Sequence, residues 1–217
     1  MNMRSTDHPC CRAAGFTLIE VLIVIGIIGL LTVVLIPNLT GAQVRGEIAD
    51  TEARLLQLRT AIDKFERENG AYPPDNFAEL KTKVTSKPVD AHNAGIESLV
   101  AHLHPKAGRG PLADKQEWLS NTDGDSNGTT IPGLDTAERV EVTDAWGTPF
   151  AYFAAQFGGY DRPQRIKRKD GEEVEVRARK GKNGKPLGPD RYQLLSAGPD
   201  GVFGNEDDIG YPELANF

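Results

Sequence analysis

One uninterrupted apolar run near the N-terminus constrains this chain more than any other feature. Residues 16–36 read FTLIEVLIVIGIIGLLTVVLI and include a single charged side chain, Glu20. A helix needs about 20 consecutive apolar residues to cross the hydrocarbon core of a bilayer. We therefore expect one membrane-spanning helix over this run, and we expect the more polar remainder to form a globular domain on one side of the membrane.

A short basic leader precedes the apolar run. Residues 1–15 contain two arginines and one aspartate and end in the small residues AAG. In a secretory signal the small residues follow the apolar core, so cleavage removes the core with the signal. Here a cut after Gly15 would remove the leader and leave the apolar helix attached. The positive charge holds the leader on the cytoplasmic side, so we expect the domain after Pro37 in the opposite compartment.

Glu20 lies where a charge is unfavourable, because a carboxylate at mid-bilayer costs about 3 kcal/mol and less near the interface. One interpretation is a carboxylate within reach of the lipid headgroups. The other requires a cation, and cleavage after Gly15 would expose one, the α-amine of Phe16. Phe16 lies four residues before Glu20 and so on the same helix face. The amine would neutralise Glu20 of its own chain or of a neighbouring chain, and the second pairing would fix the register of packed helices.

The motif GFTLIEVLIVIGIIGLL, followed by Pro37, resembles the class III signal of type IV pilins and type II secretion pseudopilins. In this resemblance Gly15 precedes the cut, Phe16 follows it and Glu20 is the fifth mature residue. The resemblance implies that a prepilin peptidase cleaves after Gly15 and methylates the new amine of Phe16. It also implies a homopolymer whose subunits pack through their N-terminal helices, with Phe16, Glu20 and Pro37 at assembly positions.

An amphipathic pattern continues the helix beyond Pro37. Charged residues occupy one face, and apolar residues recur at helical spacing on the other, namely Val44, Ile48, Leu55, Leu58, Ile62 and Phe65. Proline removes a helical hydrogen bond, so we expect a kink or a break at Pro37. We expect the helix to run from 16 to about 68 and to end at Gly70 and two prolines. The chain then divides into a leader at 1–15, a transmembrane and filament-core half at 16–37, an amphipathic half at 38–70 and a globular domain at 71–217.

Short apolar segments predict the secondary structure of the globular domain. We expect helices at 77–80 and 95–103, strands at 149–157 and 191–198, and an exposed strand at 172–180 within an extended hairpin. The amphipathic stripe must be buried, and a small antiparallel sheet can cover it. This α+β order, a long kinked helix followed by a small antiparallel sheet and a loop-rich C-terminal region, resembles the pilin fold.

Two later stretches narrow the resemblance to the major pseudopilins of type II secretion. They are DAWGTPFAYF at 144–153 and YQLLSAGPDGVFGNEDDI at 192–209. Two segments depart from that family, because 105–140 and 158–190 are longer than the corresponding segments of such proteins.

The second of these stretches offers the hard oxygen ligands that calcium prefers. The resemblance implies a structural calcium ion there, with Asp200 and Asp208 as the closest matches. The carbonyl oxygens of Leu195 and Ser196 are further candidates, and Asp207 is a candidate by proximity. The alternative is an acidic, solvated turn. A bound ion would stabilise only the folded chain and would pin the C-terminal segment against the sheet.

A second acidic loop, DGDSNG at 123–128, matches the first half of an EF-hand through Asp123, Asp125 and Asn127. The twelfth position is Leu134, where an EF-hand requires a bidentate glutamate. A turn rich in Asp, Asn and Gly is therefore favoured over a metal site.

A basic segment at 162–185 contains ten Lys or Arg and four Asp or Glu. We favour a solvated hairpin, and the alternative is a basic arm that meets an acidic patch on the next subunit or on another component. The net charge of −6 on the whole chain argues against a nucleic-acid partner.

Catalytic patterns are missing from the sequence. The two cysteines, Cys10 and Cys11, precede the expected cut, so the mature chain would have no thiol nucleophile. Neither a G-x-S-x-G motif nor a phosphate-binding loop occurs. We therefore expect a structural protein rather than an enzyme.

Three hypotheses of function follow. The first is a pseudopilin in the bacterial inner membrane, with a periplasmic C-terminal domain, that forms a short filament for export of folded proteins across the outer membrane. Its expected partners are copies of itself, a prepilin peptidase, minor pseudopilins, the inner-membrane assembly platform and membrane lipid. The second hypothesis is a type IV pilin of a surface fibre. The third is a membrane-anchored calcium-binding module that never polymerises.

Overall fold

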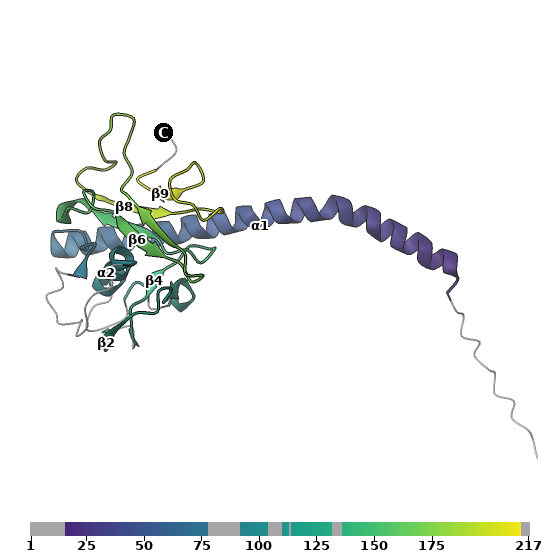
Figure 1. The fold of residues 1–217 in the computed structure, drawn as a ribbon, viewed down its shortest axis with the longest axis horizontal. Coiled ribbons are helices and arrows are strands. Elements are labelled where there is room, and N and C mark those ends of the chain that lie inside the picture. Colours follow the sequence, from purple (N-terminus) through teal and green to yellow (C-terminus); the bar gives the residue numbers. More distant parts are fainter. Residues whose placement is uncertain (1–15, 78–91, 104–109, 113, 132–135, 214–217) are drawn as a thin grey trace, which may run out of the picture. The chain divides into compact units, whose positions relative to one another are not determined.

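A computed structural model describes residues 16–77, 92–103, 110–112, 114–131 and 136–213 (Figure 1). Within these ranges, only the backbone is described at 33–40 and 127–131. The chain forms two compact units, Met1–Gln43 and Val44–Phe217, and each is described by itself. The leader lies outside the described residues, as do the side chain of Pro37 and residues 78–80 of the short helix expected at 77–80.

A single long helix, α1, spans Leu18–Asn69. This confirms the expected helix over 16–68. The backbone is helical through position 37, so the break considered there is not observed. The helix ends at Gly70, whose positive φ of 74° is the left-handed conformation that glycine adopts readily after a helix. Within the described residues, no helix carries an apolar stretch long enough to cross a bilayer. The run predicted to do so extends into 33–40.

A three-stranded antiparallel sheet forms the centre of the second unit. Its central strand is β8 (Tyr192–Ser196), which lies between β5 (Ala151–Ala154) and β9 (Ile209–Tyr211). The expected strands at 149–157 and 191–198 are thus confirmed, although Ala155–Phe157 turns into a short 3-10 helix, η3. A long helix with small antiparallel sheets confirms the predicted α+β, pilin-like class.

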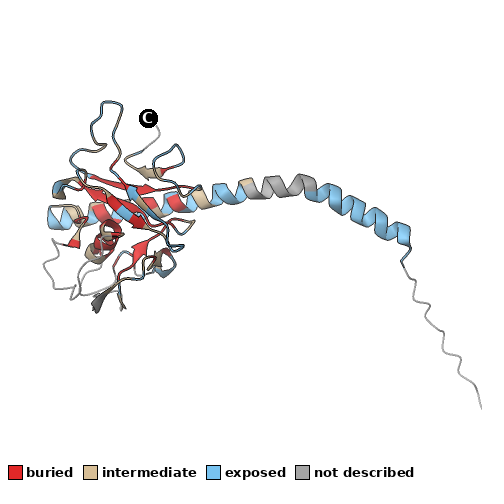
Figure 2. Ribbon diagram, in the orientation of Figure 1, coloured by how far each residue is buried: buried red, intermediate tan, exposed pale blue. Residues whose placement is uncertain are grey.

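The two faces of the sheet are covered by different layers. On one face, Tyr152 and Leu194 pack with Leu58 and Ile62 of α1 and with Leu99 of the second helix, α2 (Ala94–Leu103). This confirms the helix expected at 95–103 and the amphipathic stripe of α1 from Leu55 onward. Figure 2 shows the buried residues of the second unit in red, many of them on the strands at its centre.

On the other face, Phe153 and Leu195 pack against a two-stranded hairpin. Its strands are β6 (Gln164–Lys167) and β7 (Glu173–Val176), and their apolar side chains Ile166 and Val176 are buried. The prediction of a solvated hairpin is therefore wrong in one respect, because one face of the hairpin is buried and forms a layer of the core. Alternating side chains point to opposite faces of a strand, so the charged residues between them remain outside.

Three arginines of this basic segment form ion pairs within the chain. Arg162 pairs with Asp75, Arg168 with Glu172, and Arg179 with Asp208. Exposed lysines remain at the turns, among them Lys169, Lys180, Lys182 and Lys185. The segment therefore carries less unpaired charge than its composition indicates.

The segment between α2 and β5 adds two small antiparallel pairs. A 3-10 helix, η2 (Gln116–Trp118), leads into the first pair, β1 with β4; the second pair is β2 with β3. The strands are β1 (Leu119–Ser120), β2 (Ser126–Ile131), β3 (Thr136–Glu138) and β4 (Glu141–Val142).

Candidate functional site

The N-terminal end of α1 is closed by a reciprocal pair of hydrogen bonds. The hydroxyl oxygen of Thr17 accepts from the backbone N–H of Glu20 at 3.3 Å, and the Glu20 carboxylate accepts from the backbone N–H of Thr17 at 2.8 Å. The Thr17 hydroxyl also donates to the same carboxylate oxygen, Oε2, at 2.7 Å. This is a capping box of the form T-x-x-E, and it satisfies two N–H groups that a helix start leaves without partners.

The apolar side chains that follow the cap are solvent-exposed in this single chain. Phe16 is 87 % exposed, Leu18 83 % and Leu30 71 %, and the other large apolar residues between them are at least half exposed. They surround the helix rather than forming one stripe. Such a surface can be removed from water only by lipid or by other protein chains.

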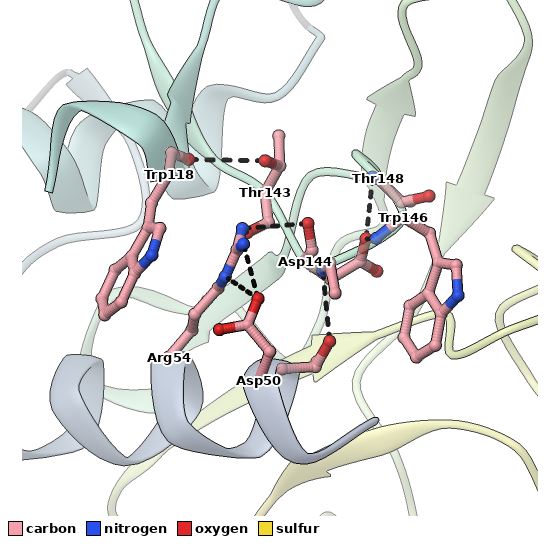
Figure 3. Close-up of polar contacts among 9 residues, drawn as sticks. Asp50, Arg54, Trp118, Thr143, Asp144, Trp146 and Thr148 are labelled. Carbon is pink, nitrogen blue, oxygen red and sulfur yellow. Dashed lines mark hydrogen bonds and ion pairs between the residues drawn. The ribbon is translucent and has the colours of Figure 1, made fainter. Parts of the chain in front are cut away.

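A second site joins α1 to the sheet through Asp144, the first residue of the DAWGTP stretch (Figure 3). The Oδ1 atom of Asp144 accepts from the backbone N–H groups of Trp146 at 3.0 Å and Thr148 at 2.9 Å. Its Oδ2 atom accepts from the hydroxyl of Ser196 on β8 at 2.7 Å. Burial raises the pKa of Asp144, and these hydrogen bonds oppose the rise by stabilising the carboxylate.

The helix side of this joint is Arg54. Its guanidinium donates to the carbonyl oxygens of Thr143 at 2.8 Å and Asp144 at 3.0 Å, while Asp50 holds its other edge at 2.7 Å. The guanidinium also lies 5.5 Å from the ring centre of Trp118. Two further bonds tie the same segment to α1: Ala145 N–H donates to the hydroxyl of Thr51 at 3.1 Å, and the indole N–H of Trp146 donates to the carboxylate of Glu47 at 2.9 Å. The DAWGTP stretch thus works as a structural joint between helix and sheet.

The residues predicted to hold calcium lie in the C-terminal loop, but the structure engages them differently. Asp208 is buried, accepts from the backbone N–H of Gly204 and pairs with Arg179. Asp200 is exposed and accepts from the N–H of Val202 at 2.8 Å and from the side chain of Asn205 at 2.6 Å.

The other three predicted ligands lie near this loop. Leu195 and Ser196 end β8, and the Ser196 hydroxyl belongs to the Asp144 joint. The carbonyl oxygen of Asp207 lies against Gly198, where an added Cβ would be only 2.1 Å from it. Among the described residues, the carboxylates of Asp200, Asp207 and Asp208 do not converge into one metal-sized group.

A different group of carboxylates does converge. One oxygen each from Glu97, Asp123 and Glu141 lies within 4.8 Å of the other two. Asp123 belongs to the loop considered as half of an EF-hand, in which the neighbouring Asp125 pairs with Arg139 at 2.5 Å. The side chain of Asn127 lies outside the described residues. The loop is an Asx-type turn in which the Asn121 side chain accepts from the N–H of Gly124 at 2.8 Å.

Several of these residues were missed at the level of sequence. The capping partner Thr17 carries a readable signal, T-x-x-E before an apolar run. Glu97 and Glu141 carry none, because the fold alone brings them together. The cleavage between Gly15 and Phe16 stays a prediction, as does the assembly role of Pro37.

Comparison with known proteins agrees with the N-terminal motif. A family model described as the prokaryotic N-terminal methylation motif matches residues 10–36. The chain is 28 % identical over 211 residues to type II secretion system core protein G of Escherichia coli, covering 95 % of this chain and 93 % of that protein. It is 32 % identical to the protein of the same name from Vibrio cholerae over 136 residues, covering 62 % of this chain and 89 % of the relative.

A relative of a different kind is the type IV wide pilus major component PilA4 of Thermus thermophilus. It is 37 % identical over 79 residues, which is 36 % of this chain and 60 % of that protein. No solved structure matches the chain significantly.

Proposed function

The chain belongs to the family of type II secretion system core protein G, and we propose on that basis that it is the structural subunit of the pseudopilus. In this role the chain polymerises through its N-terminal helix, and the filament supports export of folded proteins across the outer membrane. It performs no bond chemistry of its own. Its expected partners are other copies, the prepilin peptidase, minor pseudopilins and the inner-membrane assembly platform.

One observation supports polymerisation most directly. Residues 18–31 of α1 expose apolar side chains all around the helix, and the methylation motif at 10–36 covers these residues. Before assembly, we propose, lipid of the inner membrane surrounds this segment in a single pass, with the C-terminal domain in the periplasm. After assembly, the segments of neighbouring subunits surround one another.

Glu20 has the geometry to serve both its own helix and a neighbour. Both donors of Thr17 go to one oxygen, Oε2. The second oxygen, Oε1, accepts no hydrogen bond from any described residue. It can therefore accept from a cation such as the α-amine of Phe16 in an adjacent subunit, and such a charge-assisted bond is about twice as strong as a neutral one.

Two substitutions separate the two roles. Glu20→Gln keeps a side chain that completes a capping box but removes the charge, whereas Thr17→Ala removes the cap and keeps the charge. We expect Glu20→Gln to insert and to be processed normally but to fail in assembly, and we expect Thr17→Ala to assemble less efficiently. The measurement is cross-linking of the membrane fraction into multimer ladders, with mass spectrometry of the mature N-terminus to check that Phe16 is methylated.

Normal ladders and normal secretion from the Glu20→Gln variant would show that charge pairing has no part in assembly. An intact leader in the wild-type chain would reject the processing step itself.

The relative from Thermus favours a second candidate, a type IV pilin of a surface fibre. That similarity covers 36 % of this chain, whereas the similarity to the Escherichia coli core protein G covers 95 %. A membrane-anchored module that never polymerises is the third candidate, and the cross-linking ladders test it directly. Filaments on the cell surface without any loss of secretion in a deletion strain would favour the pilin.

The calcium ion predicted for the C-terminal loop also remains a proposal. The buried carboxylate of Asp208 supports it, and the guanidinium of Arg179 already balances that charge. Calcium would therefore have to displace Arg179, with Asp200 and the carbonyl oxygens of Leu195 and Ser196 completing the ligands.

Arg179→Gln tests this competition. If calcium and Arg179 share Asp208, the variant binds calcium more tightly than the wild-type chain, and added calcium restores its melting temperature. A variant that is destabilised and gains no more from calcium than the wild-type chain does would mean that Arg179 has replaced the ion. Calorimetric titration of the full chain in detergent measures both outcomes.

A further inference from the structure

We propose that Glu97, Asp123 and Glu141 bind a divalent cation, and that the ion is calcium. Glu97 lies in the first turn of α2, Asp123 in the loop between β1 and β2, and Glu141 in β4. One oxygen from each lies within 4.8 Å of the other two. This site is separate from the C-terminal loop and independent of the pseudopilus role.

The main support for this metal site is the buried carboxylate of Glu97. Its side chain is 2 % exposed, and neither of its carboxylate oxygens has a hydrogen-bond partner among the described residues. A buried polar group without a partner loses its hydration free energy and gains no hydrogen bond to replace it. For a buried charge this free-energy cost is far larger. Burial raises the pKa of Glu97 well above its usual range, and the nearby carboxylates of Asp125, Asp123 and Glu141 raise it further.

The other two carboxylates are held in fixed positions around Glu97. Glu141 is fully buried, and its two oxygens accept from the backbone N–H of Thr122 at 3.0 Å and from the side-chain amide of Asn93 at 2.9 Å. Asp123 is half-buried and accepts from the N–H of Asp125 at 3.3 Å. Glu97 and Glu141 therefore keep lone pairs for a further ligand, since one carboxylate oxygen has two.

The nearby positive charge does not balance the group. Arg139 attracts Glu97 electrostatically, but its guanidinium pairs with Asp125 at 2.5 Å. One guanidinium thus lies near four carboxyl groups, those of Glu97, Asp123, Asp125 and Glu141. A divalent cation would balance two further negative charges.

The ligand chemistry favours calcium over softer metals. All three side chains offer carboxylate oxygens, and neither histidine nor cysteine belongs to the group. Hard oxygen ligands suit calcium and magnesium, whereas zinc and copper prefer nitrogen and sulfur. Calcium tolerates irregular geometry and six to eight ligands, whereas magnesium requires a near-ideal octahedron. The uneven contribution from a helix, a loop and a strand fits the larger ion.

The test is thermal unfolding and calorimetric titration of the full chain in detergent, first in EDTA and then in calcium chloride. At calcium about 100-fold above the dissociation constant, one site shifts the folding equilibrium about 100-fold. For a chain of this size that shift raises the melting temperature by about 5–10 °C. We expect Glu97→Gln to lose one bound calcium and most of the shift. In EDTA this variant should melt no lower than the wild-type chain, because an amide replaces a buried carboxylate.

Matched variants isolate the site. Glu138→Gln removes an exposed charge from the same region and should behave as the wild-type chain does. Asp200→Asn alters the C-terminal loop and should leave this shift intact. If Glu97→Gln does not fold, the half-exposed Asp123→Asn should also lose the bound ion.

The proposal is overturned if Glu97→Gln and Asp123→Asn keep the wild-type stoichiometry and shift. The group would then be a set of carboxylic acids that share protons. A larger shift with magnesium chloride than with calcium chloride would overturn the choice of ion.

Discussion

Replacing Asp144 by alanine is the most direct test of the joint between helix and sheet. The Asp144 carboxylate accepts from two backbone N–H groups and from the hydroxyl of Ser196. Alanine would leave the buried N–H group of Thr148 and the partly buried N–H group of Trp146 without their acceptor. The Ser196 hydroxyl would also lose the acceptor of its proton, although its oxygen would still accept from the N–H of Gly198 at 3.1 Å.

The magnitude follows from these two amides. A buried donor left without a partner costs about 1–3 kcal/mol, so the two together cost about 2–6 kcal/mol. Loss of a buried charge offsets part of this, because burial raises the pKa of Asp144. A net loss of about 3 kcal/mol lowers the melting temperature of a chain of this size by about 6–12 °C.

The control is Asp144→Asn, which has almost the same shape. Its carbonyl oxygen can accept from both backbone N–H groups, and its amide can donate to the Ser196 hydroxyl. We expect a loss of about 1 kcal/mol or less, the net value of one ordinary hydrogen bond. Thermal unfolding of the full chain in detergent, followed by near-ultraviolet circular dichroism of the tryptophans, measures both variants. An alanine variant that melts within about 3 °C of the wild-type chain would refute the reasoning.

Two further predictions concern the core. Ile166→Ala should lower the free energy of unfolding by about 2–5 kcal/mol, because it leaves a cavity under the hairpin that covers Phe153. Denaturant titration measures the loss. A loss below about 1 kcal/mol would mean that the hairpin does not belong to the core. Burial lowers the pKa of His102, so the folded protein favours the neutral imidazole. The stability that neutral His102 contributes is present above pH 6.5 and is lost as the pH falls below that value. His102→Asn should keep the bond to the Ser98 carbonyl but should not titrate, so its stability relative to the wild-type chain should rise between pH 7.5 and pH 5; a parallel decline of both chains would contradict this.

Local periodicity is enough to predict the long helix and the central strands. The spacing of Leu55, Leu58 and Ile62 marks a helix face, and all three are buried. The sequence pattern places the start of this buried face at Val44, but Val44 is 38 % exposed. Periodicity reports which residues share a face, but the position of the sheet decides where along the helix that face is covered.

The basic hairpin shows why the charge composition of a strand does not reveal whether one of its faces is buried. The charges of 162–185 were summed over both faces of the hairpin, and the sum describes only the outer one. The inner face carries Ile166, Val176 and Ala178, which pack against Leu195. Alternation along EEVEVRARK is itself the sign of a strand with one buried face, so this part of the fold was readable from the sequence.

The carboxylate group and the Asp144 joint could not be predicted in the same way. Glu97, Asp123 and Glu141 come from three elements that are far apart in the sequence. A buried glutamate in the first turn of a helix is indistinguishable from an exposed one in a sequence, because carboxylates are common there for helix-dipole reasons. Only the tertiary structure reveals that Glu97 points into the protein.

Each of the two proposed calcium sites involves a segment that we expect to be longer than its counterpart in the resembling family. The segment 158–190 supplies Arg179, which lies on Asp208 where the resemblance implies calcium. Residue 123, in the other long segment, lies with Glu97 and with Glu141, one residue beyond that segment. A guanidinium cannot leave its chain, so pairing with Arg179 holds the C-terminal loop at any calcium concentration. A buried group of three carboxylates can instead take a cation from solution, as proposed above for Glu97, Asp123 and Glu141. If both proposals hold, this chain has moved its dependence on calcium from the C-terminal loop to the region around α2, and Glu97→Gln should then abolish more of the calcium response than Asp200→Asn.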